Sequence, residues 1–143
     1  IKKRRIINGT CFNANDGTIT VSSPTGGNGT FEATIDNTNW FSVSTGSPRV
    51  FSGLLPATYT VRIRDAAFPT CFIVLSTTET ISEPEVLNAI VNKTDISCFG
   101  ADDGTISISF PSGGGGTYEY RLDTGVWQSS GSFTGLASAT YSV

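Results

Sequence analysis

The amino-acid sequence predicts an all-β fold of tandem immunoglobulin-like β-sandwich repeats, and three observations support this fold class. Hydrophobic residues make up 38 % of the 143 residues, which is enough for a packed core, whereas charged residues make up only 15 %. Thr, Ile, Val and Phe are abundant, and these residue types favour strands. Apolar and polar residues alternate in several short segments, and no segment repeats its apolar residues with the period of an amphipathic helix.

The predicted strands are short and follow one another closely. Residues 18–22 and 31–35 alternate between apolar and polar side chains. Residues 58–64 alternate strictly, so that Val61 and Ile63 share one face and the arginines between and after them share the other. We therefore expect each of these segments to bury one face and to expose the other.

Glycine-containing turns separate the strands. Asp16-Gly17 and Asp103-Gly104 are predicted to form turns that tolerate positive φ, and glycine-rich segments at 26–29 and 113–116 mark a second loop. Roughly seven short strands with turns every 8 to 12 residues are typical of a two-sheet sandwich. Residues 55–59 fit a tyrosine corner, in which a phenol fixes the loop between the two sheets.

An internal repeat organises the chain. Residues 11–40 match residues 98–127 without a gap, and 16 of these 30 positions are identical. Further along, residues 51–61 match 133–143 at a smaller offset, so the first copy holds five extra residues in the loop before residue 51. We expect one sandwich at residues 1–84 and a second, truncated one at 85–143, with the natural chain continuing beyond Val143 through more copies.

Charge and composition exclude several classes of function. The net charge is −3, and four of the nine basic residues lie at positions 2–5, so the rest of the chain is strongly acidic and should repel nucleic acid. The longest apolar run, residues 71–75, is far shorter than the roughly 20 residues of a membrane-spanning helix, so we expect no direct membrane insertion. The sequence has no histidine and offers no nucleophile beside a base, so we expect no enzyme and no catalytic residues.

Three cysteines fit the repeat. Cys11 precedes an early strand and Cys71 opens a late one in the same copy, so we expect these two to form a disulfide. Cys98 corresponds to Cys11, and its expected partner lies beyond the end of the sequence. Such a bridge implies an oxidising, extracellular setting. The alternative is a set of buried free thiols.

The order of these motifs resembles that of the SprB repeat family of Bacteroidetes surface proteins. The resemblance rests on Cys-Phe-x-Ala-x-Asp-Gly-Thr-Ile, the Gly-Gly loop, Trp127-Gln128 and the segment Phe133–Leu136, and it runs from about Ile7 to Val143. It implies a very large cell-surface adhesin that is exported by the type IX secretion system and is similar to the protein moved along the surface of gliding bacteria. The implied partners are neighbouring repeats, surface polysaccharide or substratum, and the gliding and secretion machinery acting elsewhere on the full protein.

Aromatic residues supply candidate ligand-binding positions. Tyr118 and Tyr120 lie next to the glycine-rich segment 113–116. Tyr120 stands where the first copy has an alanine, and a ligand contact can differ between copies in this way. Trp40 and Trp127 occupy equivalent places, so we expect them to pack the sandwich in preference to stacking on sugar rings.

Three acidic residues are weak calcium candidates, namely Asp65 at a strand end and the pair Asp102 and Asp103. The pair does not fit the spacing of an EF-hand, so a hairpin turn is the preferred interpretation. We expect no other cofactor. The leading function is a structural repeat of a surface adhesin or filament that mediates attachment and gliding motility. The alternatives are a carbohydrate-binding module of a secreted polysaccharide-degrading protein and an accessory domain of a secreted enzyme.

Overall fold

The computed structural model describes residues 3–143, and its regular elements in that range are all strands, which confirms the all-β fold class. No helix of the described residues is long and apolar enough to cross a membrane. The strands are β1 (Lys3–Ile7), β2 (Gly17–Ser22), β3 (Phe31–Thr34), β4 (Phe41–Val43), β5 (Arg49–Leu54), β6 (Ala57–Asp65), β7 (Phe68–Ile81), β8 (Asn88–Thr94), β9 (Gly104–Ser112) and β10 (Ser132–Leu136).

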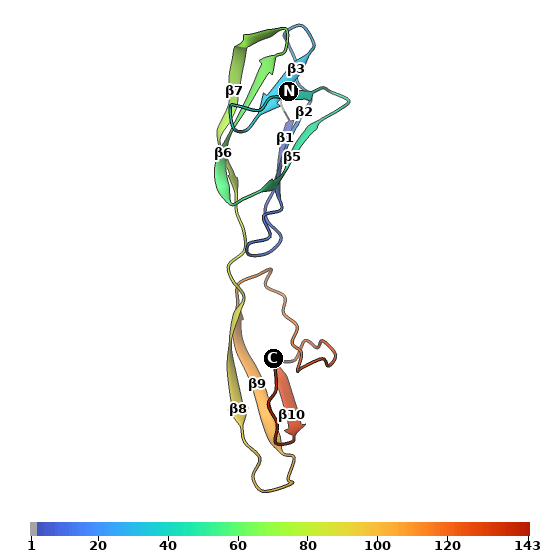
Figure 1. The fold of residues 1–143 in the computed structure, drawn as a ribbon, viewed down its shortest axis with the longest axis vertical. Coiled ribbons are helices and arrows are strands. Elements are labelled where there is room, and N and C mark those ends of the chain that lie inside the picture. The colour runs from blue at the N-terminus through green and yellow to red at the C-terminus, as the bar shows by residue number, and fades with distance from the viewer. Residues whose placement is uncertain (1–2) are drawn as a thin grey trace. The chain divides into compact units, whose positions relative to one another are not determined.

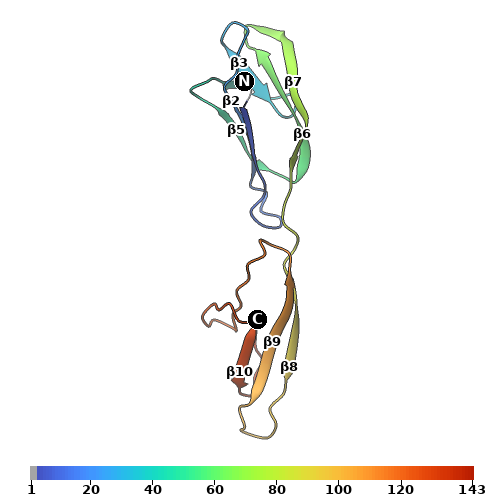
Figure 2. The same cartoon turned by 180° about the vertical axis from the view of Figure 1, so that it is seen from behind.

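The chain divides into two compact units, Ile1–Pro84 (unit 1) and Glu85–Val143 (unit 2). In unit 1 the three strands β1-β2-β5 form one antiparallel sheet, and β4-β3-β6-β7 form another. The two sheets make the two layers that Figures 1 and 2 show from opposite sides. Unit 1 is therefore a sandwich, with β1 and β7 at the edges of their sheets.

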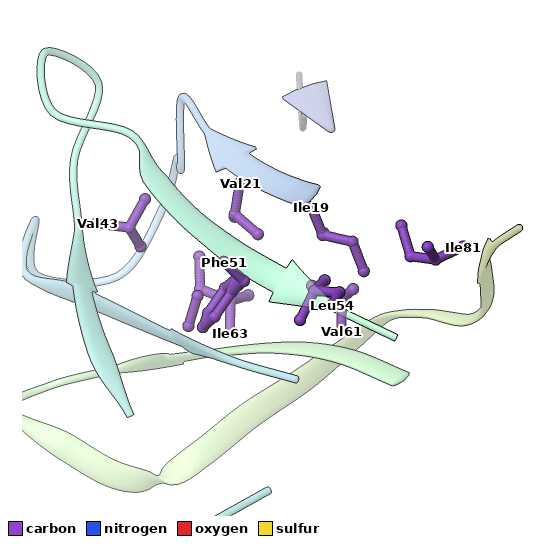
Figure 3. Close-up of a cluster of buried hydrophobic side chains, with 9 residues drawn as sticks. Ile19, Val21, Val43, Phe51, Leu54, Val61, Ile63 and Ile81 are labelled. Carbon is purple, nitrogen blue, oxygen red and sulfur yellow. The ribbon is translucent and has the colours of Figure 1, made fainter. Parts of the chain in front are cut away.

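The core of unit 1 lies between these two layers. Alternation in β2 buries Ile19 and Val21, and alternation in β6 buries Val61 and Ile63. Figure 3 shows these side chains converging with those of the other core residues. Burial of one such side chain stabilises the fold by about 1.5–3 kcal/mol. The complete buried apolar cluster is Ile19, Val21, Ala33, Val43, Phe51, Leu54, Val61, Ile63 and Ile81.

The expected tyrosine corner is present. The hydroxyl of Tyr59 donates a hydrogen bond to the carbonyl oxygen of Leu55 at 3.0 Å. In unit 2 the hydroxyl of Tyr141 donates the same bond to Ala137, again at 3.0 Å. Both units therefore fix the same loop by the same contact.

The role expected for Gly17 and Gly104 is wrong. Both glycines begin strands, and positive φ falls instead on neighbouring residues such as Asn15, at 52°, and Asp102, at 47°. A Cβ on Gly17 would lie 2.4 Å from Cγ2 of Ile81, so no other residue fits without displacing its surroundings. Close approach of the two sheets, and not turn geometry, is thus the reason for glycine at position 17.

Unit 2 repeats one of the two sheets. Its strands β8, β9 and β10 form a three-stranded antiparallel sheet, and β8 pairs with β9 in the register that β1 uses with β2. The counterpart of the second sheet is reduced to an isolated bridge between Tyr120 and Gln128. Among the described residues, the fully formed apolar core accordingly belongs to unit 1.

Candidate functional site

Outward-pointing side chains form an exposed face on the four-stranded sheet of unit 1. Alternate residues of β6 are buried in the core, so Arg62 and Arg64 point to the other side of the sheet. The register places Arg62 beside Val74 and Arg64 beside Phe72 of β7, and these two apolar side chains are 43 % and 49 % exposed. We call this surface the outer face and define it by Trp40, Arg62, Arg64, Phe72 and Val74.

Arg64 is held from two directions on the outer face. Its guanidinium carbon lies 4.2 Å from the centre of the Trp40 ring, which is the geometry of a cation–π contact. Its Nε and Nη2 each lie 2.8 Å from Oε2 of Glu32 on β3. These contacts restrict the arginine and present the tryptophan ring in a defined orientation.

Arg62 is held in a similar way further along the strand. Its guanidinium carbon lies 5.6 Å from the ring centre of Phe72, and its Nη1 donates to Oδ1 of Asn37. The Nε–H group of Arg62 is buried and has no hydrogen-bond partner within residues 3–143. The outer face thus combines flat aromatic surface with fixed guanidinium donors, a combination that can bind a ring and its polar substituents together.

The expectation that the tryptophans pack the sandwich core is wrong. Trp40 is half-buried on the outer face, and Trp127 is 55 % exposed. The guanidinium carbon of Arg121 lies 4.7 Å from the centre of the Trp127 ring, so both units place an arginine over the tryptophan.

The sequence itself indicates where this face lies. The strict alternation of residues 58–64 assigns Val61 and Ile63 to the core, and the same alternation assigns Arg62 and Arg64 together to the opposite face. What the sequence does not give is which β7 residues lie beside them.

Comparison with known protein families shows to which family the chain belongs. The SprB repeat matches residues 6–38 in unit 1 and residues 90–126 in unit 2. The chain belongs to the SprB repeat family. SprB repeats occur in adhesin-like proteins of the cell surface, and membership of this family indicates a repeat segment of such a protein and an extracellular or surface location. No curated protein and no solved structure matches the chain.

The tyrosines chosen as ligand candidates lie in the second SprB repeat. Tyr118 and Tyr120 line a cavity of about 590 Å³ together with Trp127. The hydroxyl of Tyr118 donates to the carbonyl oxygen of Gly113 at 2.8 Å, so this group is already engaged. Tyr120 stands where the first repeat has the fully buried Ala33. Their role in binding a ligand stays a prediction.

The disulfide expected in the first SprB repeat is not formed. Cys11, Cys71 and Cys98 are free and exposed, so the alternative of buried thiols is wrong as well. Cys71 lies near the start of β7, ten residues before Ile81, which places it roughly 33 Å from the end of that strand at about 3.3 Å per residue. The loop that holds Cys11 lies at that far end. A bridge needs Cα atoms within about 7 Å, so the two cysteines stand at opposite ends of the unit.

Hydrogen bonds define the end of the first repeat that holds Cys11. The N–H of Gly9 donates to the carbonyl oxygen of Ser82 at 2.9 Å, and the N–H of Ser82 donates to Oδ1 of Asn8 at 3.2 Å. The N–H of Asn13 donates to Oε2 of Glu83 at 2.6 Å. We call these three bonds the exit clamp, because they join the loop after β1 to the chain that leaves β7.

An aspartate builds the same loop in both repeats. The hydroxyl of Thr10 donates to Asp16 at 2.6 Å and lowers the pKa of this carboxyl below its usual value. In the second repeat, Ser97 donates its backbone N–H to Asp103 at 2.8 Å, and hydrogen bonding by Ser97 lowers the pKa of Asp103. The negative charge of each aspartate therefore stabilises the loop.

The calcium candidates occupy structural positions. Asp65 accepts hydrogen bonds from the N–H groups of Asn28, at 2.8 Å, and Ala67, at 3.0 Å, and so joins two loops at one end of unit 1. Asp103 is engaged with the loop described above, and Asp102 is exposed with a φ of 47°. Within residues 3–143, no three acidic or cysteine side chains gather as a metal site would require. Calcium binding by these residues stays a prediction.

Proposed function

We propose that the chain is a load-bearing repeat segment of a long secreted adhesin or filament, which mediates attachment to a substratum or polysaccharide and serves gliding motility after export by the type IX secretion system. It performs no reaction of its own. Its partners are neighbouring repeats of the same protein, together with the gliding and secretion machinery that acts elsewhere on the full protein.

The direction of β1 and β7 carries this proposal. The loop after β1 and the residues after β7 meet at the exit clamp, so both strands end at the same end of unit 1. The chain therefore enters the sandwich at one end and leaves at the other. The ladder bonds of β1 with β2 and of β6 with β7 run across the strands. A pull along the strands loads these bonds together instead of breaking them one at a time.

A single-molecule pulling experiment on the full chain tests this function. We expect unit 1 to unfold in one cooperative event at a defined force. Asn8→Ala removes one bond of the exit clamp and should lower the unfolding force, whereas Asn92→Ala alters an exposed side chain of unit 2 and should leave the force of this event unchanged. Gradual extension of unit 1 without a force peak would contradict a tensile role.

A second candidate is a carbohydrate-binding module of a secreted polysaccharide-degrading protein. The outer face supports it, because Trp40 and Phe72 present ring surface beside fixed arginines. Titration with neutral and acidic oligosaccharides, followed by tryptophan fluorescence, tests this candidate. Saturable binding that is lost on Trp40→Ala supports it, and an unchanged spectrum with every sugar counts against it.

A further inference from the structure

We propose that a cavity in unit 1 is the seat of an extended peptide segment attached ahead of Ile1, with an apolar side chain in the position that Leu87 holds in unit 2. The occupant is a stretch of chain with the chemistry of Glu85-Val86-Leu87. This inference concerns how a repeat receives its entering chain, and it does not depend on the adhesive or tensile role.

The cavity lies between the two sheets of unit 1, beside the glycine loop, and has a volume of about 380 Å³. Its walls are mainly apolar, and two wall residues, Phe68 and Ile73, remain 54 % and 49 % exposed. Exposed apolar surface inside a recess favours an apolar occupant. The apolar side chains that line the cavity include Val21, Pro24, Phe31, Ile63, Phe68 and Ile73.

The strand registers identify which segment corresponds to the missing occupant. Lys3 pairs with Ser22 in unit 1, and Ile90 pairs with Ser109 in unit 2. Ile90 lies 87 positions after Lys3, and Ser109 lies 87 positions after Ser22. By the same offset, Leu87 corresponds to the position immediately ahead of Ile1. The sequence Glu85–Leu87 is therefore the entry segment of unit 2.

The entry segment of unit 2 lies against the glycine loop. The N–H of Gly114 donates to the carbonyl oxygen of Glu85 at 2.9 Å. A Cβ on Gly113 would lie 2.1 Å from the carbonyl oxygen of Val86, and a Cβ on Gly114 would lie 2.6 Å from Cδ2 of Leu87. Two consecutive glycines are thus required there because the segment passes so close to them.

Unit 1 keeps the same loop without the segment. Gly26 and Gly27 have φ angles of +94° and +55°, close to the +78° and +58° of Gly113 and Gly114. A Cβ on Gly26 would meet no atom of the described residues within 4 Å. The space that Val86 fills beside Gly113 is therefore open beside Gly26.

Each unit contains a part of this arrangement that the other does not: unit 1 has both walls of the cavity, and unit 2 has the entry segment. Leu87 lines the 590 Å³ cavity of unit 2 together with Ile108 and Pro111. These two residues correspond to Val21 and Pro24 of the unit 1 cavity. The opposite wall of unit 1, formed by residues of β6 and β7, has no counterpart among the residues of unit 2, and Leu87 is 67 % exposed. Unit 1 holds both walls and unit 2 holds the segment, so the segment of a complete repeat would lie between the walls. It would pass beside Gly26, because Oδ2 of Asp65 already lies 2.6 Å from where a Cβ on Gly27 would be.

Extension of the full chain tests the proposal. We would fuse Pro-Glu-Val-Leu, the sequence of residues 84–87, directly ahead of Ile1, and compare it with a matched Pro-Glu-Ser-Ser extension. The apolar extension should raise the melting temperature of unit 1 by about 5 °C, because burial of a leucine side chain is sufficient for such a shift in a domain of this size. The polar extension should raise it by less than about 1 °C, since it buries no apolar side chain.

Cavity variants connect the shift to this site. Ile73→Asp, and Phe68→Ser as a second variant if the first does not fold, should abolish the gain from the apolar extension. A hydrophobic dye that fluoresces in apolar recesses should bind the original chain and be displaced by the apolar extension. Equal shifts for the two extensions, no shift for either, or a gain that survives both cavity variants would overturn the proposal, and so would full dye binding to the extended chain.

Discussion

The hydroxyl of Tyr59 donates a hydrogen bond to the carbonyl oxygen of Leu55 at 3.0 Å. The bond connects β6 to the loop that follows β5, at a place where the chain passes from one sheet of unit 1 to the other. Because the partner is a backbone group, the contact depends on the loop conformation and not on the identity of residue 55.

Tyr59→Phe should therefore destabilise unit 1 by about 1 kcal/mol, the net value of one hydrogen bond. Chemical denaturation of the full chain measures this change. Tyr141→Phe removes the equivalent bond of unit 2 and is the matched control, which should leave the transition of unit 1 unchanged. Equal stability of the wild type and Tyr59→Phe would show that the bond contributes nothing.

Gly17→Ala should destabilise unit 1 by more than about 1 kcal/mol, because the added methyl group would overlap Cγ2 of Ile81. Ile81→Ala removes that methyl group and leaves a cavity of its own. In a double-mutant cycle, Gly17→Ala should cost less in the Ile81→Ala background than in the wild type. Additive effects in the cycle would contradict the direct contact between these residues.

All three cysteines should react with a thiol reagent under non-reducing conditions, because they are free and exposed. Intact mass should then show three labels on a freshly purified monomer. A single label, with Cys11 and Cys71 protected, would instead show that these two cysteines form the disulfide expected from the sequence.

Stability should depend on pH through Asp36. The side chain and backbone N–H of Asn39, together with Thr38 and Thr34, donate to this carboxylate and hold the pKa of Asp36 well below its usual value. Because the folded-state pKa is the lower one, the contribution is present above the unfolded pKa of about 4 and is lost as the pH falls through the folded pKa.

Asp36→Ala should therefore lower the melting temperature of unit 1 more at pH 7 than at pH 2. Thermal unfolding at the two pH values measures the difference. Asp95→Ala is a suitable control, since Asp95 is highly exposed and its ion pair with Lys93 contributes little at either pH. An equal loss at both values would exclude the carboxylate charge as the cause.

On the outer face, Trp40→Ala and Phe72→Ala should each weaken any oligosaccharide binding by about tenfold or more, which corresponds to about 1.4 kcal/mol. Isothermal titration measures the affinity. Val50→Ala, an exposed apolar residue on the other sheet, should leave the affinity unchanged. An equal loss for all three variants would indicate a general effect on the fold.

Local patterns predicted much of this fold. Alternation placed Val61 and Ile63 in the core, and the Leu55–Tyr59 motif predicted the tyrosine corner. Both features depend on residues close in sequence. The prediction for Gly17 failed because the reason for glycine there is a contact with Ile81, which is remote in sequence and cannot be seen in a local pattern.

The sites were harder to predict, again because they join distant segments. Pairing Cys11 with Cys71 relied on their membership in the same repeat, but the length of β7 separates them. The alternation of residues 58–64 predicted that the arginines of the outer face lie together. The position of Phe72 beside Arg64 could not be predicted in this way, because it depends on register shifts between β6 and β7.

Strand β7 also bears on the behaviour of concentrated solutions. It is the edge strand of its sheet and contains the apolar run Cys71–Leu75, so its free backbone groups are a template on which a foreign strand could assemble into fibrils. The register between β6 and β7 shifts at three places, and such irregularities bend an edge and interrupt its hydrogen-bonding template. The shifts lie on either side of the regularly paired residues Phe72–Val74, so they shorten the regular edge on which a foreign strand could pair.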